Sequence, residues 1–118
     1  MGKLIDANVI LRYILNDSQQ SEAAKGVIEK GAYTIPEVIA EVVYVLNGVY
    51  HVARDEIAET LCTVLHEIDI EKFEAMVEAL RLYGETNMDF VDCILIARHR
   101  ILGDDVYSFD KQINKYID

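Results

Sequence analysis

The sequence predicts an α/β fold built around a short parallel sheet, and three observations support this class. Short apolar runs of strand length alternate along the chain with longer segments of helical periodicity. None of the predicted strands is joined to the next by a β-hairpin signal, so the helices must form the connections. The 118 residues include one Pro and no linker-like segment, which predicts a single domain over residues 1–118.

Four short segments are predicted to be strands. Each contains an apolar or β-branched run of the length that a buried strand needs. They are residues 3–6 (KLID), 32–35 (AYTI), 67–70 (EIDI) and 104–109 (DDVYSF). The first predicted strand ends on Asp6, and the last is followed directly by Asp110.

Seven segments are predicted to be helices. They are residues 7–15, 17–31, 36–50, 54–68, 71–84, 87–100 and 111–118. Segment 54–68 is the clearest, because its apolar residues return at helical spacing. Segment 36–50 is rich in β-branched residues, so a strand is the alternative there. Its length and the opening Pro36 favour a helix.

The ends of segment 17–31 carry their own signals. Asp17 is a candidate N-cap, and Gln20 follows it at the spacing of a capping box. Gly31 is the kind of residue that closes a helix. The segment is therefore expected to begin after Asp17 and to end at Gly31.

Acidic residues from distant parts of the chain are expected to meet at the carboxyl edge of the sheet, where open parallel sheets bind ligands. Asp6 and Asp110 follow the first and last predicted strands. Asp89 and Asp92 are three residues apart at the start of a predicted helix, so they share one of its faces. Glu41 lies one turn inside the helix after the second strand, between apolar residues.

Such a group of carboxylates suits a divalent cation. Crowded carboxylates repel each other and are costly to bury without a partner. Mg²⁺ and Mn²⁺ prefer oxygen ligands, and such ions stabilise charge on a phosphodiester. We therefore expect Mg²⁺ or Mn²⁺ as the cofactor, with Asp6, Glu41, Asp89, Asp92 and Asp110 as its ligands.

Each of these acids also has a simpler explanation. Asp6 and Asp89 precede helices and are candidate N-caps. Asp92 lies in a first helical turn, where the helix dipole favours an acid, and Asp110 suits a turn. Glu41 could lie on the solvent edge of its helix. The joint pattern, rather than any single acid, favours the metal site. In that case Asp89 caps the helix and Asp92 reaches the ion.

The composition restricts the possible functions. A formal net charge of −10 argues against broad electrostatic capture of nucleic acid. It is compatible with a nuclease in which metal ions neutralise an acidic pocket. Two cysteines are too few for a disulfide framework and predict a reducing, cytoplasmic compartment. No apolar run approaches the roughly 18 residues of a membrane span, and the start lacks a signal-peptide arrangement.

Four pieces of the sequence resemble the motifs of PIN-domain ribonucleases, most of all the VapC-type toxins of prokaryotic toxin–antitoxin pairs. The pieces are LIDANVILRYIL, IPEVIAEVVYVL, MDFVDCILIA and VYSFD. They occur in the order of that family and at about its spacing, and the likeness covers nearly the whole chain. The resemblance implies a three-layer sandwich in which helices flank a short central parallel sheet.

The resemblance assigns the catalytic and metal-binding acids as Asp6, Glu41, Asp92 and Asp110. Asp89 is similar to an additional acid that many members carry one turn ahead of the third. Asn8 matches a polar residue that helps to order the first acid, and Ser108 matches a small hydroxyl residue near the fourth. Cys93 stands where the family usually has Ala, and we expect it to pack in the core.

The resemblance also implies an activity and partners. We expect cleavage of single-stranded RNA with Mg²⁺ or Mn²⁺, a homodimer and a small antitoxin partner. The lack of an apolar run of membrane-span length adds the expectation of no membrane association. Apolar residues on the first helices, such as Ile10, Ile14 and Val45, exceed what one small core needs. This surplus is a second reason to expect a homodimer.

The RNA contacts are expected to come from Arg12, Arg98 and Lys111, with ordinary solvated charge as the alternative. Two other functions are the alternatives. A PIN fold without catalysis would be a binding module, although every expected acid is present. A Mg²⁺-binding receiver domain needs an Asp ending its central strand and a Lys ending its last strand. Asp69 is followed by Ile70, and the last predicted strand ends in SFD, so neither requirement is met.

Overall fold

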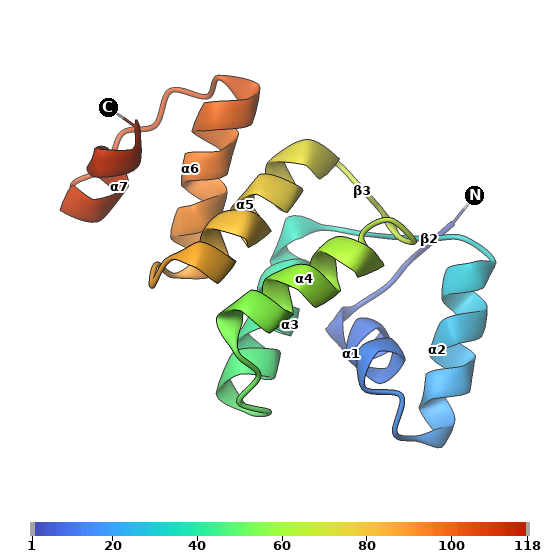
Figure 1. The fold of residues 1–118 in the computed structure, drawn as a ribbon. Coiled ribbons are helices and arrows are strands. Elements are labelled where there is room, and N and C mark those ends of the chain that lie inside the picture. Colours follow the sequence, from blue (N-terminus) through green and yellow to red (C-terminus); the bar gives the residue numbers. More distant parts are fainter. Residues whose placement is uncertain (1, 118) are drawn as a thin grey trace.

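The structure is a computed structural model that describes residues 2–117, and it has the α/β class that the sequence predicts (Figure 1). In chain order the elements are β1 (Lys3–Leu4), α1 (Ala7–Leu15), α2 (Gln19–Glu29), β2 (Ala32–Thr34), α3 (Pro36–Gly48), α4 (Arg54–Val64), β3 (Asp69–Ile70), α5 (Phe73–Glu85), α6 (Phe90–Leu102) and α7 (Lys111–Ile117). The predicted helices are confirmed, as are the first three predicted strands.

The sheet is parallel and has the order β1-β2-β3. β2 lies in the centre, where Ala32 pairs with Lys3 of β1, and Tyr33 pairs with Asp69 of β3. Two helices connect each strand to the next, as the absence of hairpin signals predicts. This order leaves β1 at an edge, with no second partner strand within residues 2–117.

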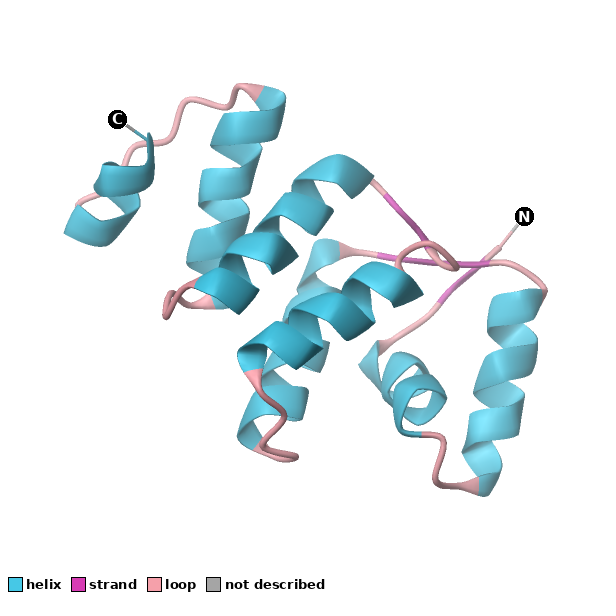
Figure 2. Ribbon diagram, viewed as in Figure 1, coloured by secondary structure: helices cyan, strands magenta, loops and turns pink. Residues whose placement is uncertain are grey.

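The prediction of a fourth strand at residues 104–109 is wrong. This segment runs as a loop along the outside of α6 and leads into α7 (Figure 2). Gly103 ends α6 in the left-handed conformation, with φ at 76°. Arg98 Nε then lies 2.6 Å from Asp104 Oδ2, and His99 Nδ1 lies 2.9 Å from the Asp104 carbonyl oxygen. These local contacts hold the start of the segment against α6, away from the sheet.

The predicted capping box of Asp17 and Gln20 is also wrong. Ser18 is the N-cap of α2, and its N–H donates to Ser21 Oγ at 3.3 Å. The cap lies one residue later than predicted because Ser18 itself takes the extended conformation that precedes a helix. Pro36 is the first residue of α3, as predicted, and the helical course of this segment excludes the alternative strand.

The hydrophobic core uses the apolar residues that were expected to be in surplus. Ile10 is fully buried in the core. Ile14 and Val45 are partly buried and pack against it. The predicted surplus of apolar residues is therefore wrong, because these three side chains contribute to the core of the single chain. It gives no reason to expect a homodimer.

Both cysteines are free thiols. Cys93 is buried in the core, as expected, and burial raises the pKa of its thiol to about 11. Burial also raises the pKa of Cys62, which is partly exposed. Within residues 2–117, every helix is too short or too polar to cross a lipid bilayer.

The chain is elongated, with extents of 47 × 33 × 18 Å. Its radius of gyration is 14.7 Å, whereas a compact chain of this length is expected at about 13.5 Å. α5 packs mainly against α4 and α6, while α1 packs against α2 and α3. As Figure 1 shows, α6 and α7 therefore extend away from the sheet, with α3 and α4 between them and β1.

The contact between α4 and α5 is so close at Gly84 that no side chain fits there. A Cβ at Gly84 would lie 2.9 Å from Ala58 Cβ and 3.4 Å from Asp55 Cα. Gly48, the last residue of α3, has no such neighbour within 4 Å. The two glycines thus form a matched pair, one required for packing and one not.

Gly84→Ala should lower the free energy of unfolding by about 1–3 kcal/mol, because α4 and α5 must separate to admit the methyl group. Gly48→Ala should leave it unchanged or raise it by up to about 1 kcal/mol, because Ala is the better helix former. Denaturant unfolding followed by circular dichroism measures both. Equal effects of the two substitutions would contradict the close contact.

Candidate functional site

Asp89 and Asp92 lie at the start of α6, as the sequence predicts. Asp89 occupies the N-cap position, but its side chain makes no capping hydrogen bond. Asp89 therefore lies at the predicted cap position, but the prediction that its side chain caps the helix is wrong. Asp92 lies in the first turn of α6 and is partly buried.

The surroundings of Asp92 disfavour the ionised form of its carboxyl group. Burial is the main effect that raises its pKa, followed by the negative charges of Asp110 and Asp89. No hydrogen bond from the described residues offsets these effects. Asp89, Asp92 and Asp110 thus form a group, here called the C-terminal acid group, whose members act on Asp92 through their charge.

Asp110 is held in place by the start of α7. Its Oδ1 accepts hydrogen bonds from the N–H groups of Gln112 at 2.8 Å and Ile113 at 3.1 Å. The Asp110 N–H donates to Ser108 Oγ at 2.9 Å, and Asn114 Nδ2 donates to the Ser108 carbonyl oxygen at 3.0 Å. Ser108 therefore orders Asp110, while Oδ2 of Asp110 takes no part in this cap.

Asp6 has the same arrangement at the start of α1. It is the N-cap of that helix, and its Oδ1 accepts a hydrogen bond from the Val9 N–H at 3.1 Å. Asp6 and Asn8 line an open hollow of ≈ 320 Å³ between α1 and α2. Glu41 is exposed on α3. The capping explanation of Asp6 is thus confirmed, and it leaves one carboxylate oxygen unused by the cap.

Within residues 2–117, the predicted acids do not form one compact cluster. In the part of the chain that the structure describes, no three His, Cys, Asp or Glu side chains are arranged to hold one ion. Asp6 lies at the start of α1, and the C-terminal acid group lies at the starts of α6 and α7, on the other side of α3 and α4 (Figure 1). The predicted acids therefore lie in two separate parts of the molecule. One part contains α1 with Asp6, and the other contains α6 and α7 with the C-terminal acid group.

The three cations expected to contact RNA have different surroundings. Arg12 lines the hollow beside Asp6, and its Nε donates to Gln20 Oε1 at 3.0 Å. Arg98 is engaged in the ion pair with Asp104. Lys111 is exposed and directly follows Asp110. Arg12 and Lys111 therefore lie beside predicted acids, one in each part of the molecule.

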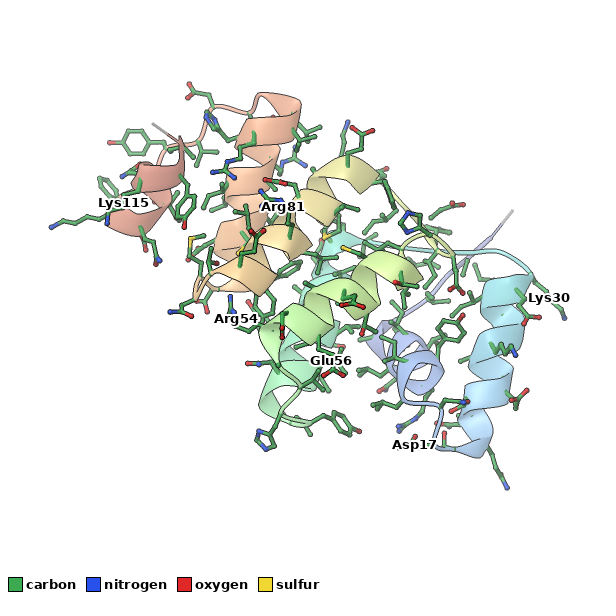
Figure 3. All side chains as sticks on the ribbon, viewed as in Figure 1. Asp17, Lys30, Arg54, Glu56, Arg81 and Lys115 are labelled. Atoms are coloured by element: carbon green, nitrogen blue, oxygen red, sulfur yellow. The ribbon has the colours of Figure 1, made fainter. Side chains whose placement is uncertain are left out.

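Arg54 supports the site and was not predicted from the sequence. Its Nε donates to the Tyr83 carbonyl oxygen at 2.9 Å, its guanidinium lies 3.7 Å from the centre of the Tyr83 ring, and Nη2 donates to the Met88 carbonyl oxygen. Figure 3 shows Arg54 near the connection between α5 and α6. It therefore fixes the backbone next to Asp89. The available signal was a cation in a first helical turn, where the helix dipole disfavours it.

The family model described as PIN domain matches residues 3–117. The chain belongs to the PIN-domain family. This confirms the family that the four sequence motifs predict, and the match takes the place of the receiver-domain alternative.

One relative of this PIN domain is the VapC ribonuclease of Aquifex aeolicus (strain VF5). The two are 29% identical over 122 residues, which cover 96% of this chain and 90% of the relative. No solved structure gives a significant match to this PIN domain.

Asp92→Asn should make this PIN domain more stable in chelator at neutral pH. Because the folded-state pKa of Asp92 is raised, its ionised form is disfavoured by folding, so stability falls as the pH rises through that pKa. Asn has nearly the same shape without the charge. The carboxylate is partly exposed and screened by solvent, so the gain should not exceed about 1 kcal/mol.

Thermal melts of both proteins at several pH values measure this effect. The gain should disappear when the pH falls below the ordinary pKa of an aspartate, because Asp92 is then neutral in both the folded and the unfolded states. Glu59→Gln, on the exposed side of α4, is the control and should have little effect. A lower melting temperature for Asp92→Asn at neutral pH would show that the acid stabilises the helix instead.

Proposed function

We propose that this PIN domain is a metal-dependent endoribonuclease that cleaves single-stranded RNA as the toxin of a toxin–antitoxin pair. The observation that carries the proposal is the C-terminal acid group, in a chain that matches the PIN domain over residues 3–117. The ribonuclease name of the Aquifex aeolicus relative supports the reaction. The phosphodiester bond is the bond that would be hydrolysed.

The chemistry of the available donors fits Mg²⁺ or Mn²⁺. All proposed ligands are carboxylates, and these ions prefer oxygen donors. Asp6 and Asp110 each use Oδ1 for a helix cap, so Oδ2 remains available on both. The raised pKa of Asp92 reflects unbalanced negative charge, which a cation would offset. The ion, when bound, would supply positive charge to the phosphodiester.

The residues of the chain have distinct proposed roles. Asp6, Glu41, Asp92 and Asp110 would hold the ion, with Asp89 as an additional acid. The helix starts that carry Asp6, Asp92 and Asp110 provide N–H groups and positive dipole ends, which favour anions. Asn8 and Ser108 would position Asp6 and Asp110, and for Ser108 the hydrogen bond to the Asp110 N–H supports that role. These roles require no protein nucleophile.

Substrate contacts and partners complete the proposal. Arg12, Lys111 and, if its ion pair with Asp104 opens, Arg98 would contact the RNA backbone. A small antitoxin protein is the proposed inhibitor. The two free thiols fit the reducing, cytoplasmic environment that the cysteine count predicts. The division of the acids between two parts of the chain favours one alternative, a PIN-fold binding module without catalysis.

The proposed activity predicts slow cleavage of single-stranded RNA with Mg²⁺ or Mn²⁺, and none with chelator. Asp6→Asn and Asp92→Asn should each abolish cleavage, because each removes a ligand charge and keeps the side-chain shape. A fluorescently labelled single-stranded RNA, resolved on a denaturing gel, reports the products.

Two controls make this test specific. Glu59→Gln changes an exposed acid outside the proposed site and should cleave at the wild-type rate. Circular dichroism should show that all variants retain the fold. If the wild-type chain does not cleave RNA with either metal, the binding-module alternative replaces the nuclease.

Metal binding predicts a second result that does not depend on RNA. Mn²⁺ should raise the wild-type melting temperature, because a ligand of the folded state stabilises it by about 1.4 kcal/mol at ten times its dissociation constant. Asp92→Asn should show a much smaller shift, while Glu59→Gln should match the wild type. Differential scanning calorimetry with chelator and with Mn²⁺ measures this. Equal shifts in all three proteins would remove Asp92 from the metal site.

A further inference from the structure

Arg54 of α4 joins the end of α5 to the start of α6 through two backbone carbonyl groups (Figure 3). Its Nε donates to the Tyr83 carbonyl oxygen at 2.9 Å, and its Nη2 donates to the Met88 carbonyl oxygen. The Tyr83 carbonyl lies in the last turn of α5, where the helix supplies no further N–H group. The Met88 carbonyl lies one residue before Asp89, the N-cap of α6. This arrangement is here called the Arg54 clamp.

The Tyr83 ring supports the same guanidinium. Arg54 Cζ lies 3.7 Å from the centre of the ring, a distance at which the ring face attracts a cation. The ring also meets that of Phe90, the first residue of α6, edge to face at 5.8 Å. Both aromatic side chains are buried in the core. The clamp is therefore built on packed rings from α5 and α6, which restrict where the guanidinium can lie.

Further contacts hold the short connection between α5 and α6. Thr86 Oγ1 donates to the Leu82 carbonyl oxygen at 2.7 Å and accepts from the Met88 N–H at 3.3 Å. The Cys93 thiol, a weak donor, lies 3.9 Å from the Met88 carbonyl oxygen. The Met88 backbone is thus held through both its N–H and its C=O group, and Arg54 supplies the charged donor.

Two acids of the C-terminal acid group begin directly after this held backbone. Asp89 follows Met88, and Asp92 lies one turn further along α6, on the same face. The Cys93 N–H donates to the Asp89 carbonyl oxygen at 3.1 Å and closes the first turn. Because the Asp89 side chain makes no capping hydrogen bond, the start of α6 depends on its neighbours. A shift of this turn would move both carboxylates together.

We propose that Arg54 is a positioning residue that fixes Asp89 and Asp92 in the arrangement that binds the divalent ion. This role rests on the proposed nuclease function, and it acts through the backbone of the α5–α6 connection rather than through contact with the ion. Groups that orient metal ligands from outside the coordination sphere change metal affinity by about 10–100-fold when they are replaced.

The charge of Arg54 and its geometry have opposite effects on cation binding, so the two effects can be separated. If charge alone mattered, removal of the guanidinium would strengthen metal binding, because like charges repel. Loss of the clamp would instead weaken binding, because the two carboxylates would no longer be held in one arrangement. Within residues 2–117, the ion pairs join other residues and do not include Arg54. This favours a clamp on the backbone over a charge that neutralises an acid.

Arg54→Met tests the clamp, because Met retains an extended side chain and removes both the charge and the donors. The probe is Mn²⁺ alone, and the electron paramagnetic resonance signal of free Mn²⁺ measures the bound fraction. The dissociation constant should rise about 10–100-fold relative to the wild type. Arg54→Lys keeps the charge without the planar fork and should give a smaller rise. An unchanged or lower dissociation constant for Arg54→Met would overturn the proposal.

Control variants separate positioning from a general loss of stability. Arg81→Lys changes an arginine of α5 whose partners include Glu78 and Glu85 of the same helix. Ile28→Val removes a buried methyl group from α2 and destabilises the fold away from α5 and α6. Both should bind Mn²⁺ as the wild type does. Weakening of the same size in either control would contradict a specific role of Arg54.

If Arg54→Met does not fold, Arg54→Lys decides the question. A folded Arg54→Lys variant that binds Mn²⁺ as tightly as the wild type would overturn the proposal, because its charge is retained and only the fork is lost. Weaker binding in this variant, with both controls unchanged, would support the clamp.

Hydrogen exchange gives a readout that needs no metal. The Cys93 N–H is bonded to the Asp89 carbonyl oxygen, and the Ile10 N–H is bonded to Asp6 in the same way at the start of α1. Arg54→Met, or Arg54→Lys in its place, should speed exchange at Cys93 far more than at Ile10, whereas Ile28→Val should not. Equal changes at the two positions would contradict the clamp.

The outcomes distinguish this role from the proposed function. If the wild type binds Mn²⁺ and Arg54→Met binds it equally well, the role of Arg54 fails and the nuclease proposal stands. A wild-type chain that binds no Mn²⁺ would overturn the metal site of the proposed nuclease. It would also overturn the role of Arg54 toward the ion, even if exchange at Cys93 shows that the clamp holds α6.

Discussion

The packing of α5 between α4 and α6 is the interaction on which the geometry of the acids depends. α5 buries Leu80 completely and approaches α4 so closely that position 84 has to be glycine. On its other side, Glu78 pairs with Arg81 of the same helix and with Arg100 of α6, and hydrogen bonding from Arg81 is the main effect that lowers the Glu78 pKa. These contacts fix the direction of α6, so they decide where Asp92 lies relative to the sheet.

Elements whose structure follows from neighbouring residues could be predicted from the sequence. The helices were predictable because each contains its own apolar periodicity, and for α3 the length of the segment and Pro36 together favoured a helix over a strand. The segment 104–109 shows the limit of this reasoning. It has the composition of a strand, but a strand also needs an edge to pair with, and nearby contacts of Asp104 with α6 hold it elsewhere. The expected role of Ile10 in a dimer failed for a similar reason, since burial depends on distant elements.

The candidate site was also predictable only in part from the sequence. The positions of Asp6, Asp89, Asp92 and Asp110 at helix starts could be predicted, because each follows from the local pattern. Their convergence could not, because it depends on how far the C-terminal helices lie from β1. Arg54 escaped notice because its partners are backbone carbonyl groups at positions 83 and 88, and no side-chain pattern reveals such contacts.

The two capping aspartates carry an evolutionary consequence. Asp6 and Asp110 each hold a helix start through one oxygen, so selection for folding alone would retain them in a descendant that had lost its chemistry. Among the described residues, Asp92 makes no comparable capping hydrogen bond, and its negative charge opposes folding. In a lineage released from selection for catalysis, Asp92 should therefore be replaced first, while the other two persist as remnants. Comparison of these three positions among relatives would then distinguish catalytically active members from those that have lost catalysis.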